Sequence, residues 1–364
     1  MALIGLLLNK RQRIPYYGTL SRKYGFQLMV FDAENIHWPT ATVTGLLLSR
    51  GQWYETRRAL PAVIYNRCYP EDKQVIAQLE TILGKGQVFN STTLFDKWDV
   101  YKILHGFEKL QPILPNTKEL VVDELPELLA QGTWVLKPRL GQSGRGLYQL
   151  KLQGDFVVIS SGMNLPLPLP AGTGISGVAA VLTGGEPYIV QAYVPSAVYD
   201  GGLFDVRLVV QKDKHRAWVI TGELSRLAEM GSFITNQFKA ILHPREVLLS
   251  LGEKGRAAYK VMRRAALLSA EALDGPLGHL GELCVDFMVD EDGHPWLVEV
   301  NGKPDKGLFF ELDDENMLEQ VYLTPLMYAK SLSTKLPWGK GSRGSIREYM
   351  PKLIEGGPPW NPLN

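Results

Sequence analysis

The sequence predicts a mixed α/β and α+β protein of two or three domains, and three observations support this fold class. The chain has 364 residues, which corresponds to roughly two or three domains of about 150 residues each. Its N-terminal region alternates short apolar runs with amphipathic stretches, a pattern typical of strands separated by helices. From Trp134 to Val210 the apolar residues recur with period two between Gly and Pro residues, which indicates antiparallel strands.

The N-terminal elements predict a parallel sheet, because strands that alternate with helices usually lie parallel. Strands are expected at Leu3–Leu8, Gln27–Phe31, Ala62–Tyr65 and Gln87–Phe89, with helices at Pro15–Tyr24 and Lys73–Leu83. A short helix is expected within residues 95–104, before the prolines at 112 and 115.

The later elements predict an antiparallel sheet, a long helix and a hairpin. The segment Ser161–Pro187 is rich in Gly, Pro and Leu and is assigned only as an irregular connection. Glu253–Leu273 is the longest predicted helix, and Gly281–Asn301 is predicted to form two strands of a hairpin. The predicted domains are residues 1–92, 93–195 and 196–334, followed by a tail at 335–364.

Composition excludes several classes of protein. The 39 Lys and Arg residues balance 38 Asp and Glu residues, so no overall field attracts the chain to nucleic acid or to an anionic membrane. No apolar run approaches the roughly 18 residues of a membrane helix, and the apolar opening is interpreted as a buried strand. Cys68 and Cys284 are the only cysteines, which favours a reducing cytoplasm. We therefore expect a cytoplasmic protein without nucleic-acid or membrane partners.

A glycine-rich segment follows a predicted strand that ends in Lys137. Gly141, Ser143, Gly144 and Gly146 lie within six residues, and glycines let backbone N–H groups approach phosphate oxygens closely. The spacing matches neither the dinucleotide-binding fingerprint nor the P-loop. Phosphate binding and a purely structural hairpin loop both remain open for this segment.

An acidic set is predicted on the last hairpin. If Asp292 and Gly293 form a two-residue turn, facing positions have numbers that sum to 585, and Asp286 faces Glu299 with Asn301 on the same face. Facing carboxylates repel each other, and Mg²⁺ shared with substrate phosphates would relieve that repulsion. A solvated acidic face is the alternative.

Three further features are weaker candidates. The apolar strand Tyr188–Val194 either holds an adenine at its end or is an ordinary core strand. Arg207 interrupts another apolar strand, so it either pairs with Asp205 or faces a ligand. Arg226 and Asn236 are polar candidates of the same kind, and the six histidines show no metal-ligand spacing.

Taken in this order, the motifs resemble the ATP-grasp superfamily over roughly residues 90 to 310. The resemblance rests on Phe95-Asp96-Lys97, Lys137-Pro138 with the glycine-rich loop, Gln191 to Val194, Asp205-x-Arg207, Asp286 and Glu299-x-Asn301. Within the superfamily, Tyr65-Asn66-Arg67, Val88-Phe89-Asn90-Ser91 and Phe95-Asp96-Lys97-Trp98 are similar to the YheC/YheD group, which is associated with the coats of bacterial endospores.

The resemblance implies an N-terminal βαβ domain followed by two lobes that grip ATP between them. The roles it implies are phosphate contacts by Lys97 and Lys137, a cover formed by Gly141, Ser143, Gly144 and Gly146, adenine contacts by Gln191, Tyr193 and Val194, Mg²⁺ binding by Asp286, Glu299 and Asn301, and catalytic roles for Arg207, Arg226 and Asn236. The sequence departs from the family pattern at two places. Gln191-Ala192 lacks the acidic residue often found at the adenine site, and no glycine pair follows Asn236.

The resemblance also implies a reaction. It predicts an ATP- and Mg²⁺-dependent ligase that joins a carboxylate to an amine or similar nucleophile through an acyl phosphate and releases ADP and phosphate. Its partners would be small-molecule or peptide substrates, and spore coat proteins are further expected partners. The alternative is a structural or adaptor protein of the spore that binds nucleotide without turnover.

Overall fold

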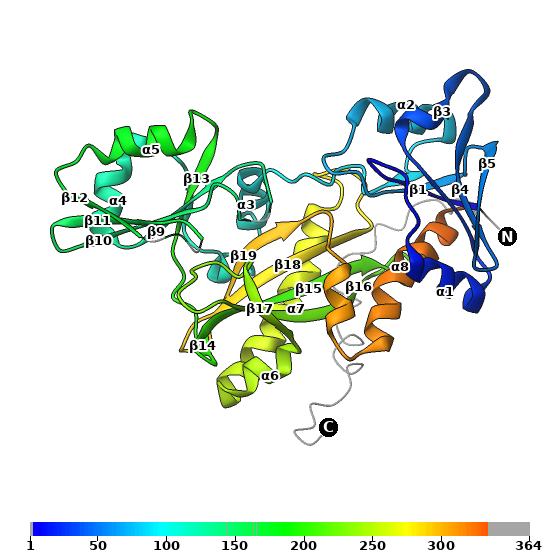
Figure 1. The fold of residues 1–364 in the computed structure, drawn as a ribbon. Coiled ribbons are helices and arrows are strands. Elements are labelled where there is room, and N and C mark those ends of the chain that lie inside the picture. The colour runs from blue at the N-terminus through cyan, green and yellow to red at the C-terminus, as the bar shows by residue number, and fades with distance from the viewer. Residues whose placement is uncertain (1–2, 143, 163, 165, 334–364) are drawn as a thin grey trace. The chain divides into compact units, whose positions relative to one another are not determined.

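The computed structural model describes residues 3–142, 144–162, 164 and 166–333, and within them the strands form three sheets (Figure 1). Ser143 and the predicted tail at 335–364 lie outside the described residues. The predicted N-terminal elements are confirmed as β1 (Leu3–Leu7), α1 (Pro15–Tyr24), β2 (Gln27–Phe31), β6 (Val63–Asn66), α2 (Lys73–Leu83) and β7 (Val88–Phe89).

The N-terminal sheet is wound on both faces. Its strand order is β3 (Ile36–His37), β4 (Thr42–Ser49), β2, β1, β6 and β7, and β1 pairs in parallel with both β2 and β6. Successive strand residues point to opposite faces. Leu6 therefore packs in the same core cluster as Leu20 of α1, whereas Leu7 packs with Leu79 of α2.

Three antiparallel strands extend this sheet, and the sequence analysis predicted none of them. They are β3 (Ile36–His37), β4 (Thr42–Ser49) and β5 (Gln52–Ala59). None of the eight β5 side chains is buried, so the strand has no apolar face from which a period-two pattern could be recognised.

The middle lobe contains an antiparallel sheet in the order β12-β11-β10-β9-β13-β8. Figure 1 shows α4 (Leu125–Gln131) and α5 (Ile175–Thr183) on one face of it, where Leu128 and Ala179 join its core. The assignment of residues 161–187 as an irregular connection is wrong, because they contain β12 and α5. The strands are β8 (Thr117–Glu119), β9 (Trp134–Pro138), β10 (Tyr148–Gln153), β11 (Phe156–Ser160), β12 (Leu167–Pro170) and β13 (Tyr188–Ala192).

The C-terminal lobe is built on a second antiparallel sheet in the order β17-β16-β15-β18-β19, with β14 beside β15. The predicted long helix is confirmed as α7 (Gly252–Leu273), whose Ala258 and Met262 pack into the core of this lobe. The helix α3 (Lys97–His105) packs Val100 and Leu104 into the same core. The other elements are α6 (Pro244–Leu249), β14 (Val198–Tyr199), β15 (Gly202–Lys212), β16 (Trp218–Ala228), β17 (Phe238–Leu242), β18 (Glu282–Val289) and β19 (Pro295–Asn301).

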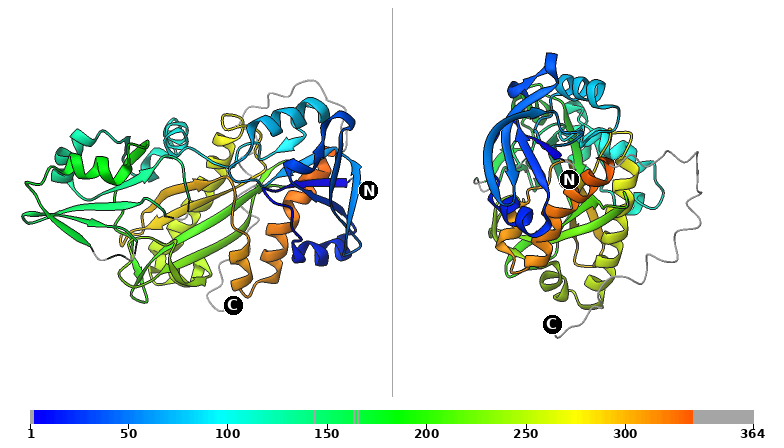
Figure 2. Two further views of the ribbon diagram at one scale, coloured as in Figure 1. Left: turned by 45° about the horizontal axis from the view of Figure 1, so that its top comes forward. Right: turned by 90° about the vertical axis from the view of Figure 1, so that its right-hand side faces the viewer.

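A shared core and a buried polar cluster join the N-terminal sheet to the C-terminal lobe. The last helix, α8 (Glu315–Ser333), lies against the N-terminal sheet (Figure 2), and its Val321 belongs to a cluster that also contains Leu224 of β16. Glu282 of β18 accepts hydrogen bonds from Tyr65, Arg67 and Gln211 and forms an ion pair with Lys306. Burial favours a higher pKa for Glu282, but Lys306 and Arg67 outweigh it and lower the pKa.

Among the helices of the described residues, none combines the length and the apolar character that crossing a membrane requires.

Candidate functional site

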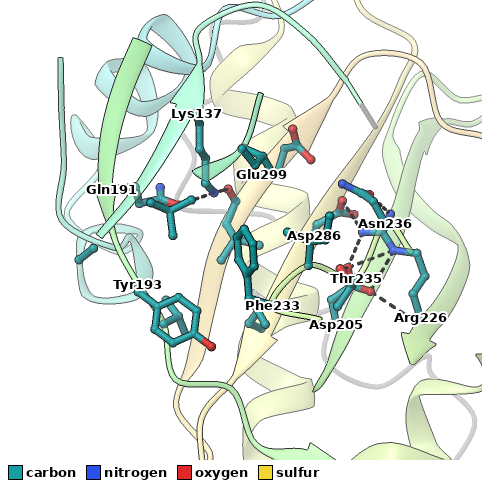
Figure 3. A pocket seen from close by; sticks show the side chains of 17 residues that line it. Lys137, Gln191, Tyr193, Asp205, Arg226, Phe233, Thr235, Asn236, Asp286 and Glu299 are labelled. Atoms are coloured by element: carbon teal, nitrogen blue, oxygen red, sulfur yellow. Dashed lines mark hydrogen bonds and ion pairs between the residues drawn. The ribbon is translucent and has the colours of Figure 1, made fainter. Parts of the chain in front are cut away.

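The candidate site is a pocket between the middle-lobe sheet and the C-terminal sheet. It has about 650 Å³ of empty space, part of it open to solvent. Apolar walls come from Val135 of β9 and from Met288 and Val298 of the hairpin. Eight residues predicted from the sequence line it (Figure 3): Lys137, Gln191, Tyr193, Val194, Arg226, Asn236, Asp286 and Glu299.

Lys137 is held near the end of β9 by contacts from both lobes. Its Nζ donates to Oε1 of Gln191 at 2.6 Å and to the carbonyl oxygen of Val298 at 3.3 Å. The Gln191 amide in turn donates to Thr117 at 2.9 Å, which fixes its orientation. Burial lowers the pKa of Lys137 to about 8, although the nearby Glu299 opposes this shift. A buried ammonium group held in this way is suited to receive an anionic ligand.

The register of the last hairpin places Asp286 opposite Glu299, as predicted, but for a different reason. The turn is wider than two residues, and within it Asp290 accepts hydrogen bonds from the amides of Asp292 and His294. The residue numbers of facing pairs near the turn therefore sum to 584 rather than 585, as the pair Val289 and Pro295 shows. A bulge at Val298 then shifts the register by one. The bulge also places Val298 on the pocket, consistent with the frequent occurrence of bulges beside active sites.

Asp286 belongs to a buried network of alternating charges. Its two oxygens accept hydrogen bonds from Arg207 at 2.8 and 2.7 Å, and Arg226 reaches it at 3.1 Å. Asp205 pairs with Arg226 and accepts a hydrogen bond from Thr235. The suggested pairing of Asp205 with Arg207 is therefore wrong, because each carboxylate is neutralised from a neighbouring strand. Burial favours a higher pKa for Asp286, but the two arginines outweigh it and lower the pKa.

We expect Asp286→Ala to reduce the free energy of unfolding by about 3 to 5 kcal/mol, because it leaves the buried Arg207 without its partner. Urea denaturation measures this change. Asp292→Ala is the matched control on the same hairpin, since its ion pair with Lys254 is exposed and is worth about 1 kcal/mol or less. Equal losses in the two variants would contradict the buried network.

Glu299 has cationic neighbours that the sequence did not reveal. Its Oε1 lies 3.6 Å from Nζ of Lys97, and Lys97 also donates to the carbonyl oxygen of Gly141 at 3.0 Å. Lys97 is positioned because Asp96 caps α3 and binds Arg139 at the end of β9. The predicted repulsion between the two facing carboxylates is therefore already offset by protein cations, which come from distant parts of the sequence.

The glycine-rich loop approaches the C-terminal lobe beside the pocket. Gly144 has φ of +71°, and a Cβ added there would lie 3.2 Å from Nδ2 of Asn236. Asn236 is itself held by Arg226, which donates to its Oδ1 at 2.8 Å. Gly144 thus allows a close approach that a larger residue would obstruct.

Several residues of the predicted site lie around the pocket rather than on its lining. Arg207 contacts the pocket residue Asp286, Lys97 lines a neighbouring pocket that shares Glu299, and Asn301 follows Glu299 on the same face of β19.

Sequence reasoning missed Phe233 and Thr235, which come from a loop without a recognisable pattern. It assigned Asp205 only as a partner for Arg207. The lining residues not predicted as site residues include Val135, Asp205, Phe233, Ile234, Thr235, Met288 and Val298.

The oxygen donors of the site fit Mg²⁺, which prefers carboxylate and amide oxygens together with substrate phosphates. The side chains of Glu299 and Asn301 have no hydrogen-bond partner among the described residues, and the Lys97 ion pair at 3.6 Å is the one contact of the Glu299 carboxylate found there, so their oxygens are open to a metal. Both oxygens of Asp286, by contrast, already bind arginines. Within the described part of the chain, no group of three or more His, Cys, Asp or Glu side chains converges. A Mg²⁺ site here therefore depends on ligand phosphates.

Comparisons with known families and proteins identify relatives of this chain. A family model described as YheC/D-like ATP-grasp matches residues 85–332. The chain is 25% identical over 331 residues to the endospore coat-associated protein YheD of Bacillus subtilis, covering 87% of this chain and 73% of YheD. It is 23% identical over 354 residues to the endospore coat-associated protein YheC of the same organism, covering 88% and 92% of the two chains.

Solved structures share the fold at low sequence identity. N5-carboxyaminoimidazole synthetase from Staphylococcus aureus, in complex with ADP, matches with a TM-score of 0.56 and 12% identity, over 89% of this chain and 76% of that one. N5-carboxyaminoimidazole ribonucleotide synthetase from Thermotoga maritima matches with a TM-score of 0.53 and 14% identity, over 90% and 76%. At these identities the likeness establishes the fold and leaves function to the residues of the site.

Proposed function

This chain belongs to the YheC/D-like ATP-grasp family, and from its pocket we propose that it is an ATP- and Mg²⁺-dependent ligase that activates a carboxylate as an acyl phosphate. The nucleophile would be an amine or a similar group, and ADP and phosphate would be released. The observation that carries the proposal is the convergence of Lys137 from one lobe with Glu299, Asp286 and Arg226 from the other lobe. Cations and carboxylate oxygens on the facing walls of the pocket suit a nucleoside triphosphate with its metal ion.

The apolar part of the pocket supports adenine binding at the end of β13. Val135 lies on one wall and Met288 and Val298 on the other, so a flat base would be packed between them. The amides of Ala192 and Tyr193 already donate to protein carbonyls, whereas the amide of Val194 has no partner among the described residues. Gln191 supports this site through Lys137 and Thr117.

The polar part of the pocket supports phosphoryl transfer to a carboxylate. Lys97 and Lys137 would hold the nucleotide phosphates, and the loop with Gly141, Gly144 and Gly146 would cover them. Glu299 and Asn301 would bind Mg²⁺, which would neutralise charge on the phosphates, and Asp286 would join them or hold the arginines in place. Arg226 and Asn236 would orient the transferred group, with Arg207 supporting them through Asp286. Such a reaction depends chiefly on positioning and charge neutralisation.

The proposal can be tested without knowing the nucleophile. We expect purified protein, Mg-ATP and pooled carboxylic acids, including amino acids and short peptides, to form hydroxamates when hydroxylamine is added, because hydroxylamine intercepts acyl phosphates. ADP should appear in equal amount. Glu299→Gln should give neither product.

A second candidate function follows from the two curated relatives, which are named as endospore coat-associated. An adaptor that binds nucleotide without turnover would interact with coat proteins through a nucleotide-dependent state. ATP binding without ADP or hydroxamate formation across the pooled acids would favour this candidate over the ligase. We propose association with the spore coat for either candidate.

Nucleotide affinity should depend on pH through Lys137. Its pKa in the free protein is lowered to about 8, and bound phosphates would raise that pKa again. Binding above pH 8 must therefore take up a proton, so ATP affinity should be constant below pH 8 and weaken by up to about tenfold per pH unit above it. Calorimetry at several pH values measures this. Lys137→Arg should flatten the profile, because arginine stays charged, and an equal decline in both proteins would contradict the assignment.

A further inference from the structure

The N-terminal sheet reverses its winding direction between β1 and β6. The chain passes from β1 to β2 on one side, and β6 pairs with β1 on the other side, with all three strands parallel. In open sheets of this kind, ligands bind outside the carboxyl ends of the strands at such a switch point. Asn9 follows β1 and Tyr69 follows β6, so both residues lie at this place.

Hydrogen bonds tie the two segments together. The amide of Tyr69 donates to Oδ1 of Asn9 at 2.7 Å, and Nδ2 of Asn9 donates to the carbonyl oxygen of Pro70 at 3.4 Å. Arg67 lies beside them, but it is engaged by Glu282 and by the carbonyl oxygen of Pro304. The backbone of the switch point is thus fixed, and Asn9 is exposed to solvent.

Lys303 reaches the same place from the segment that follows β19. Its Nζ lies 5.9 Å from the centre of the Tyr69 ring, and the residue is half-buried. Its electrostatic neighbours include Arg67, Asp305 and Glu282, yet no carboxylate of the described residues lies within 4.0 Å of it. The nearby Lys306, by contrast, pairs with Glu282 at 2.9 Å. Lys303 is therefore a cation that the described residues leave unpaired.

The Tyr69 hydroxyl is also available to a ligand. It has no hydrogen-bond partner among the described residues, and burial, Glu299 and Glu71 raise the pKa of Tyr69 to about 12. The phenol is therefore a hydrogen-bond donor at neutral pH. Lys303 lies two residues after Asn301, the last residue of β19, so the switch-point cluster, defined as Asn9, Tyr69 and Lys303, borders the proposed phosphoryl-transfer site.

We infer that the switch-point cluster binds an anionic group of the carboxylate substrate, and that this substrate is a small acid with a second carboxylate besides the reacting one. This inference rests on the proposed function. Lys97 and Lys137 serve the nucleotide side of Glu299, whereas Lys303 and Tyr69 lie on the side of the N-terminal domain. A reacting carboxylate loses its own charge when it becomes an amide, so a second anionic group, in this proposal a carboxylate, keeps the substrate bound to Lys303 throughout the reaction.

Calorimetry with glutarate, succinate and the monoacid butyrate tests the inference on full-length protein, with and without Mg-ADP. We expect at least one diacid to bind wild type about tenfold or more tighter than butyrate, the size of one charge-assisted contact. Lys303→Gln should abolish that preference, and Lys303→Arg should retain most of it. Lys85→Gln, which changes an exposed lysine of the N-terminal domain, is the matched control and should behave as wild type.

The inference would be overturned if neither diacid bound wild type more tightly than butyrate, or if Lys303→Gln kept the same preference. Its failure is distinguishable from failure of the proposed function. Diacid binding that depends on Lys303, in a protein that does not bind Mg-ADP, would support the cluster and contradict the nucleotide site. Mg-ADP binding without any diacid preference would contradict the cluster alone.

Discussion

Glu299→Gln is expected to reduce turnover by about 100-fold or more and to remove the stabilisation that Mg-ATP gives the wild type. The side chain supplies the most open carboxylate oxygens of the pocket, and its charge is needed to hold a metal next to the phosphates. A ligand at 100 times its dissociation constant stabilises the folded state by about 2.7 kcal/mol. The increase in melting temperature caused by Mg-ATP, compared between wild type and variant, measures how much of this stabilisation the variant retains.

The melting temperature measured without metal distinguishes the loss of Mg-ATP stabilisation from a folding defect. Glu299 is partly exposed and lies 3.6 Å from Lys97, so the substitution should change metal-free stability by only about 1 kcal/mol or less. Glu291→Gln, at an exposed position of the same hairpin loop, should preserve the full Mg-ATP shift. If Glu299→Gln preserved it as well, Glu299 would not be a metal ligand.

Lys137→Met should weaken ATP binding by about tenfold to 100-fold and reduce turnover further. The variant keeps the volume of the side chain but removes a cation that contacts both lobes through Gln191 and Val298. Charge-assisted hydrogen bonds of this kind contribute about 1.5 to 3 kcal/mol each, which corresponds to the expected loss of affinity. Calorimetric titration with Mg-ATP gives the change directly.

Lys151→Met is the matched control, because Lys151 is an exposed lysine on β10 of the same lobe. Its affinity for Mg-ATP should equal that of wild type. If Lys137→Met bound Mg-ATP as tightly as this control, the assignment of Lys137 to the phosphates would be wrong.

Local patterns in the sequence were sufficient to predict four of the eight α-helices of the described residues, α1, α2, α3 and α7, and several strands. The helices α1, α2 and α7 follow apolar periodicity, and Asp72 and Asp96 cap α2 and α3 with their side chains. The elements missed include the helices α4, α5, α6 and α8 and the strands β3, β4 and β5. The strand β5 exposes most of its side chains, and α5 lies among glycines and prolines that ordinarily indicate loops.

The residues of the candidate site were named in part from the register of one hairpin and in part from the resemblance of short motifs to ATP-grasp proteins. Contacts between distant strands were not predictable in this way. Arg207 and Asp286 are 79 positions apart, so no local pattern could show that Asp286 is neutralised. The facing of Asp286 and Glu299 was predicted correctly although a wider turn and a bulge at Val298 each shifted the register by one and cancelled.

The central claim is that the pocket between the two lobes binds Mg-ATP. Calorimetric titration of Mg-ATP into wild type and Lys137→Met at pH 7 tests it most directly. The account predicts one binding site per chain in wild type that depends on Mg²⁺ and is weakened at least about tenfold in the variant. No binding to wild type, or equal binding to both proteins, would contradict it.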